Sequence, residues 1–99
     1  MSIIEQNKNK IESLCKIHNV DKLYIFGSVA TSNFTDKSDI DFLVKFRKFD
    51  LERYFENYMS LKDKLNKVFN REVDLIEEQT LKNPILIYSI NKNKELIYG

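Results

Sequence analysis

The sequence is organised around residues 27–44, which read Gly27-Ser28-Val29-Ala30-Thr31-Ser32-Asn33-Phe34-Thr35-Asp36-Lys37-Ser38-Asp39-Ile40-Asp41-Phe42-Leu43-Val44. A mostly apolar run, residues 22–26, comes directly before it and predicts a buried strand. A second strand is expected over residues 39–46, and it carries two aspartates among apolar residues. Because successive side chains of a strand point to opposite faces, Asp39 and Asp41 should share one face of the sheet.

These two aspartates predict a divalent cation. Like charges this close repel each other and favour protonation unless a cation lies between them. Oxygen ligands suit Mg²⁺, which takes one or two protein carboxylates and completes its shell with water and substrate phosphate. Gly27 and Ser28 fit such a substrate, because glycine allows a tight turn and the residues after it can offer N–H and hydroxyl groups to an anion. The predicted ligand is therefore a nucleoside triphosphate.

A third strand with an aspartate is expected over residues 72–76. Val73 and Leu75 should share a buried face, which leaves Asp74 on the opposite one. We expect this strand to pair directly with the strand of Asp39 and Asp41, so that all three carboxylates point the same way. The alternative is an edge strand on which Asp74 is only a solvated charge.

Gly27-Ser28, followed after a linker by Ser38-Asp39-Ile40-Asp41, resembles the signature of the nucleotidyltransferase superfamily of DNA polymerase beta. Within that superfamily the chain resembles the minimal nucleotidyltransferases (MNT proteins), which are often the antitoxin partners of HEPN toxins. The resemblance implies a catalytic site for two Mg²⁺ ions, built from Asp39, Asp41 and Asp74. It also implies nucleotide contacts by Gly27, Ser28 and Ser38.

The activity that the resemblance implies is transfer of a nucleotide, AMP from ATP, to a hydroxyl group of a partner protein. For an MNT antitoxin, the acceptor would be a tyrosine of its HEPN toxin. Larger relatives carry further domains for an RNA, DNA or antibiotic acceptor, and no such domain is expected here.

One departure from the family pattern weakens this prediction. After Gly-Ser the family usually has a basic residue, Ala, Arg and Gly, whereas this chain has residues 29–32, Val-Ala-Thr-Ser. The arginine that would neutralise phosphate charge is missing, and Lys37 or Lys45 could replace it only if the geometry allows. The alternative function is therefore an inactive MNT module that neutralises or scaffolds its partner by binding alone. The three aspartates favour the enzyme, and the missing arginine favours the binding module.

Charge and length limit the other possibilities. The chain has 99 residues with 16 basic against 15 acidic, and we expect a single domain over residues 1–99. Basic and acidic residues are interleaved along the chain, so the sequence does not favour an extended nucleic-acid surface. No apolar run has the length of a signal peptide or a membrane span, and we expect a cytoplasmic protein without membrane contact.

The remaining elements predict an α/β (α+β) fold, a small nucleotidyltransferase palm with one mixed sheet covered by helices. Residues 3–18 and 50–69 have helical apolar spacing, with Asp50 as an N-cap. A short helical turn over 28–32, a loop over 33–38, a helix that starts at Asn83-Pro84 and a strand over 95–99 complete the order.

His18, Cys15 and one aromatic stripe invite a functional interpretation that we consider weaker than a structural one. His18 is expected to cap or pack at a helix end and not to act as a base. Cys15 is expected to be a small buried hydrophobe. The aromatic stripe of residues 51–69 is expected to be mostly core, although it could also serve as a nucleobase platform, and Tyr54 or Tyr58 could reach a partner.

Overall fold

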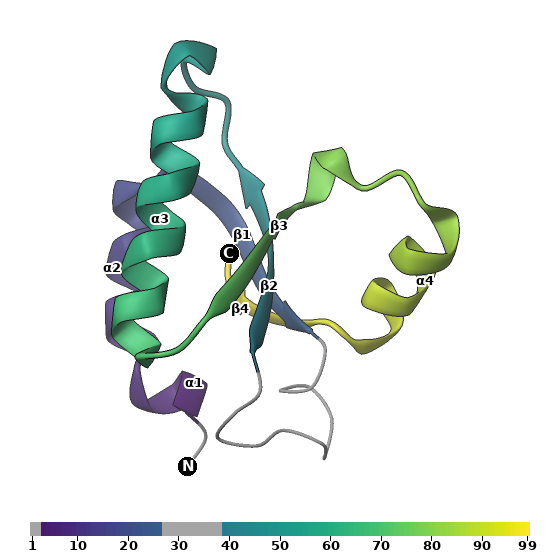
Figure 1. Cartoon of the computed structure of the whole chain (residues 1–99), viewed down its shortest axis with the longest axis horizontal. Coiled ribbons are helices and arrows are strands. Elements are labelled where there is room, and N and C mark those ends of the chain that lie inside the picture. The colour runs from purple at the N-terminus through teal and green to yellow at the C-terminus, as the bar shows by residue number, and fades with distance from the viewer. Residues whose placement is uncertain (1–2, 27–38) are drawn as a thin grey trace.

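One four-stranded sheet with strand order β3-β2-β1-β4 forms the centre of the computed structural model (Figure 1), which describes residues 3–26 and 39–99. The strands are β1 Val20–Phe26, β2 Ile40–Phe46, β3 Val73–Glu77 and β4 Glu95–Tyr98. Strand β1 pairs antiparallel with both β2 and β4, whereas β2 and β3 are parallel. The predicted mixed sheet and the predicted pairing of β2 with β3 are confirmed.

Helices lie on both sides of the sheet, as Figure 1 shows. Their bounds are α1 Ile3–Gln6, α2 Lys8–Ile17, α3 Tyr54–Phe69 and α4 Pro84–Asn93, with short 3-10 helices η2 Leu51–Arg53 and η3 Glu78–Thr80. Helix α4 begins as predicted, because the Asn83 side chain accepts hydrogen bonds from the N–H groups of Ile85 and Leu86.

The main hydrophobic core lies between the sheet and helices α2 and α3. Ile40, Phe42 and Val44 point from β2 into this core, where the Phe42 and Phe69 rings are 5.8 Å apart. Leu43 and Ile90 are also buried, but neither belongs to this core. Helix α4 lies on the other side of the sheet from α2 and α3 (Figure 1).

The N-terminal helix is interrupted, so the prediction of one helix over residues 3–18 was wrong. The Asn7 side-chain amide donates to the Ile3 carbonyl at 2.9 Å, and the Asn7 N–H donates to the Ile4 carbonyl. An asparagine that bonds its own backbone in this way competes with the helical ladder and separates α1 from α2. The predicted end of the helix is correct, because Asn19 has a left-handed φ of 61°.

The predicted long helix begins with η2 and continues as α3. Asp50 accepts a hydrogen bond from the Glu52 N–H at 3.2 Å, which confirms it as the N-cap. The expectation that the apolar stripe is core was wrong for two members, since Leu51 is 85% and Phe55 is 74% exposed. Successive residues are rotated by about 100° around a helix axis. Phe55 therefore lies beside the buried face of the helix, which carries Leu61 and Leu65, and not on that face.

Both structural predictions for His18 and Cys15 are confirmed. The His18 ring nitrogens lie 2.7 Å from the Leu14 carbonyl and 2.9 Å from Ser60 Oγ, so the ring links α2 to α3. Cys15 is fully buried, and its thiol has a pKa raised to about 12, mainly by burial and also by the nearby Glu12 carboxylate.

Within residues 3–26 and 39–99, no helix combines the length and the apolar character that crossing a bilayer requires.

Candidate active site

Asp41 and Asp74 lie beside each other on neighbouring parallel strands. The register pairs Asp41 with Asp74, and it pairs Ile40 with Val73 on one side and Phe42 with Leu75 on the other. Neighbouring strands are about 4.8 Å apart, so the two aspartates leave the sheet side by side. Because Phe42 and Leu75 are buried in the helix-covered core, both carboxylates point to the other face.

Strand β3 is an edge strand and Asp74 is exposed. Both features agree with the alternative interpretation, in which Asp74 is only a solvated charge. That alternative does not account for Asp41, whose side chain is half-buried opposite Asp74. The predicted pairing of β3 with β2 is therefore confirmed, and the role of Asp74 as a metal ligand stays a prediction.

Asp39 is the third predicted carboxylate and stands directly before β2. It is exposed and stands two positions from Asp41 along the chain. Burial raises the pKa of Asp41 above its usual value, and the charges of Asp74 and Asp39 raise it further. The three carboxylates therefore interact unfavourably when all are ionised and no cation is bound.

The chain also enters and leaves the β1–β2 connection at this point. Phe26, the last residue of β1, pairs with Asp41. Phe26 is the last described residue before the β1–β2 connection, and it lies beside Asp41. Gly27, Ser28 and Ser38 lie outside the described residues, and their predicted nucleotide contacts stay predictions.

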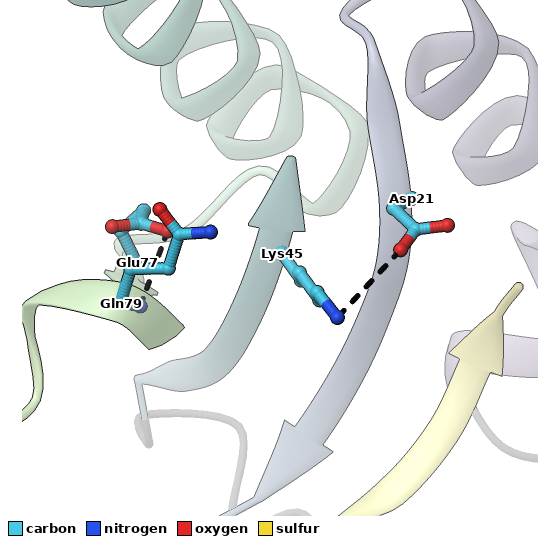
Figure 2. A network of polar contacts seen from close by, with 4 residues as sticks. All are labelled: Asp21, Lys45, Glu77 and Gln79. Atoms are coloured by element: carbon cyan, nitrogen blue, oxygen red, sulfur yellow. Dashed lines mark hydrogen bonds and ion pairs between the residues drawn. The ribbon is translucent and has the colours of Figure 1, made fainter. Parts of the chain in front are cut away.

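Lys45 does not lie beside the aspartates. It is four residues along β2 from Asp41, which is about 13 Å of strand. Figure 2 shows its side chain directed across the sheet to β1, where its Nζ lies 4.0 Å from Asp21 Oδ2. Lys45 is thus poorly placed to replace the missing arginine, and Lys37 is outside the described residues.

Two side chains of α3 contact β3 next to Asp74, and the sequence analysis did not assign them this position. The Asn66 Oδ1 atom accepts a hydrogen bond from the Val73 N–H at 2.8 Å, and the Tyr58 hydroxyl donates to the Leu75 carbonyl. Burial raises the pKa of Tyr58, and so does the charge of Asp74. Tyr58 and Asn66 are about two helical turns apart, and this spacing could have indicated that both side chains lie on the same face of the helix.

Tyr54 also faces the protein and not a partner. Its ring packs against Phe46 and Phe49, with centroid distances of 5.7 and 6.1 Å, and its hydroxyl interacts with Glu77. Glu77 is buried at the end of β3, where its carboxylate accepts a hydrogen bond from the Gln79 N–H (Figure 2). The expectation that Tyr54 or Tyr58 reaches a partner surface therefore has no support in their contacts.

The carboxylates have the chemistry of a site for a hard divalent cation. Their donors are all oxygen, and Asp41 and Asp74 come from adjacent rigid strands. In residues 3–26 and 39–99, no three His, Cys, Asp or Glu side chains already form a group that could hold a metal ion. A cavity of about 530 Å³ contains none of these aspartates, since it lies between the end of α2 and the start of α3.

Comparisons with known proteins identify the family of the chain. The family model for "Polymerase beta, Nucleotidyltransferase" matches residues 9–99. A relative from Methanocaldococcus jannaschii, provisionally named protein adenylyltransferase MJ1379, is 36% identical over 83 residues, which cover 82% of this chain and 78% of the relative.

Solved structures share the fold. A structure provisionally named a minimal nucleotidyltransferase superimposes with a TM-score of 0.78 at 26% identity, over 96% of this chain and 95% of that one. A crystal structure of a toxin-antitoxin with AMP-PNP gives a TM-score of 0.72 at 25% identity, over 94% of this chain and 73% of that one.

We predict that Asp41→Asn raises the melting temperature by about 2–4 °C in metal-free buffer. The substitution keeps the size of the side chain and removes a half-buried charge that two neighbouring carboxylates repel, although solvent screening limits the gain. Thermal unfolding followed by circular dichroism measures the change. Asp63→Asn is the control, because Asp63 is an exposed residue that pairs with Lys67 on the surface of α3. A melting temperature below that of the wild type would contradict the predicted repulsion.

Proposed function

Because the chain belongs to the polymerase beta nucleotidyltransferase family, we propose that it transfers AMP from ATP to a hydroxyl group of a partner protein. The observation that carries this proposal is the register of β2 and β3, which sets Asp41 beside Asp74 on the face of the sheet opposite the main core. Asp39 stands two residues away, and its charge acts on Asp41. These are three oxygen donors for a metal-dependent transfer at a phosphate group.

In the proposed reaction, the acceptor oxygen attacks the α-phosphorus of ATP while the bond to the pyrophosphate oxygen breaks, and the hydroxyl proton is released. Asp39 and Asp41 would hold both Mg²⁺ ions, and Asp74 would hold the ion on the acceptor side. When bound, the ions supply charge neutralisation at the triphosphate and lower the pKa of the acceptor hydroxyl. Gly27, Ser28 and Ser38 would contact the phosphates from the connection that begins beside Asp41.

A protein acceptor fits this molecule better than a nucleic acid. The net charge of +1 offers no extended basic track for a phosphate backbone. Apolar side chains are exposed instead on α4, where Ile85 is 79% and Tyr88 is 70% exposed. Helix α4 lies on the side of the sheet to which Asp41 points, so an acceptor that docks on it would approach the carboxylates. Docking of this kind holds the acceptor in a fixed orientation, so that a bimolecular transfer becomes effectively unimolecular.

We further propose that the acceptor is a tyrosine of a HEPN-type toxin and that the chain acts as its antitoxin within a complex. Two observations support this partner. The motifs resemble those of MNT proteins, and the toxin-antitoxin crystal structure with AMP-PNP has the same fold over 94% of this chain. The provisional name of the archaeal relative, a protein adenylyltransferase, agrees with a protein acceptor.

The second candidate function is an MNT module that neutralises its partner by binding alone. The observation in its favour is the sequence at 29–32, which lacks the family arginine. The two functions differ in one measurable respect, since only the enzyme consumes ATP and labels its partner.

We predict that Asp74→Asn separates nucleotide binding from transfer. Affinity for Mg²⁺ with ATP should stay close to the wild-type value, while the transfer rate falls about 10³-fold, because the acceptor-side ion acts mainly in the transition state. Asp41→Asn should abolish both. Calorimetric titration with a non-hydrolysable ATP analogue measures binding, and labelled ATP measures transfer. Equal losses of affinity and rate in Asp74→Asn would contradict this division.

We predict that labelled AMP appears on a co-expressed HEPN-type partner in the presence of Mg²⁺ and not on generic RNA. The near-neutral surface provides no binding track for RNA, whereas the partner supplies its own docking surface. Gel autoradiography with α-labelled ATP, followed by mass spectrometry of the labelled peptide, identifies the acceptor residue. Extension of free RNA without label on the partner would reject the protein acceptor. A stable complex that shows no label on either substrate would instead identify the binding module.

A further inference from the structure

We propose that Asn66 and Tyr58 are positioning residues, which hold β3 on both sides of Asp74 and so fix the distance between its carboxylate and that of Asp41. The inference rests on the proposed function, because it takes Asp74 as a ligand of the acceptor-side ion. It adds two residues of α3 to the machinery of the site, neither of which touches the reacting atoms.

The outer edge of β3 is the place where these residues act. The Ile40 N–H of β2 donates to the Glu72 carbonyl at 3.3 Å, so Glu72 directs its backbone toward β2. Backbone groups of alternate residues point to opposite sides of a strand, and Val73 and Leu75 therefore direct theirs away from β2. Within residues 3–26 and 39–99, no strand pairs with this edge, since β3 is terminal in the sheet order.

Side chains of α3 take the place of the missing neighbouring strand. Asn66 Oδ1 accepts from the Val73 N–H at 2.8 Å, and the Tyr58 hydroxyl donates to the Leu75 carbonyl. The residue before Asp74 and the residue after it are thus both bonded to the same helix. Val73 and Leu75 are also buried beneath that helix, at 0% and 2% exposure.

This arrangement matters because Asp41 and Asp74 repel each other when ionised. Asp41 is on a central strand and is held from both sides, whereas Asp74 is on an edge strand that β2 holds from one side only. Edge strands with unpaired backbone groups are the least constrained part of a sheet. The hydrogen bonds from α3 to Val73 and Leu75 hold β3 from the side that β2 does not contact.

The same helix offers matched control residues. Asn57 donates its side-chain amide to the His18 carbonyl at 2.7 Å, and the Tyr54 ring packs against Phe46. Both residues resemble the proposed pair in type and degree of burial. The Tyr54 hydroxyl interacts with Glu77, which is three residues along β3 from Asp74, so Tyr54→Phe removes a contact with β3 that does not flank Asp74. Asn57→Ala reports the general cost of disturbing α3.

The test is a titration of the full chain with Mn²⁺ in the presence of saturating α,β-methylene ATP, followed by electron paramagnetic resonance. In Asn66→Ala and Tyr58→Phe, the weaker of two Mn²⁺ sites should lose about 10-fold in affinity, while the tighter one is unchanged. Asn66→Asp keeps an oxygen acceptor for the Val73 N–H and should stay within about 2-fold of the wild type. Asn57→Ala and Tyr54→Phe should do the same.

A double-mutant comparison separates positioning from a general structural role. In an Asp74→Asn background, adding Asn66→Ala should have no further effect on Mn²⁺ affinity or on the transfer rate, because the residue acts through Asp74. Wild-type Mn²⁺ binding in both Asn66→Ala and Tyr58→Phe, or equal losses in the controls, would overturn the inference alone. If the wild type bound no second Mn²⁺, the proposed function would fail and the inference with it. Tyr58→Phe keeps its partly buried ring, so the test remains decisive if Asn66→Ala does not fold.

Discussion

Parallel pairing of β2 with β3 is the constraint on which the rest of the molecule depends. Parallel strands require a long crossover connection, and α3 supplies it while covering the main core. The register of this pairing then decides where the charges lie. A shift by one residue would turn Asp74 into the core and Val73 or Leu75 to solvent, so burial of the apolar residues fixes the position of the aspartate.

The two faces of the sheet consequently differ in what they carry. The face toward α2 and α3 contains the main core, whereas the other face carries Asp41 and Asp74 and lies toward α4. Helix α4 leaves Ile85 and Tyr88 largely exposed, which costs stability that a docked protein would restore. Stability thus comes from one face, and the proposed chemistry and docking belong to the other.

Sequence alone was sufficient for the strands and for the face that each aspartate takes, because alternation in a strand is a local rule with a period of two residues. It also predicted that β2 and β3 pair, whereas the register of Asp41 with Asp74 is known only from the structure. It was insufficient where a side chain competes with the backbone, as Asn7 does between α1 and α2. It also missed the exposure of Phe55 and the contacts of Asn66 with Val73, since both depend on how α3 is rotated above the sheet. Gly27, Ser28 and Ser38 lie outside the described residues, so their predicted contacts depend on the family resemblance.

Anomalous diffraction from crystals grown with Mn²⁺ and α,β-methylene ATP measures most directly whether the paired aspartates form a metal site. The predicted result is Mn²⁺ density within coordination distance, about 2.0–2.3 Å, of carboxylate oxygens of Asp41, Asp39 and Asp74 on the face of the sheet opposite the main core. The nucleotide phosphates should contact the same ions. Nucleotide density elsewhere on the molecule, or bound nucleotide with no Mn²⁺ at Asp41 and Asp74, would contradict a metal-dependent transfer at this site.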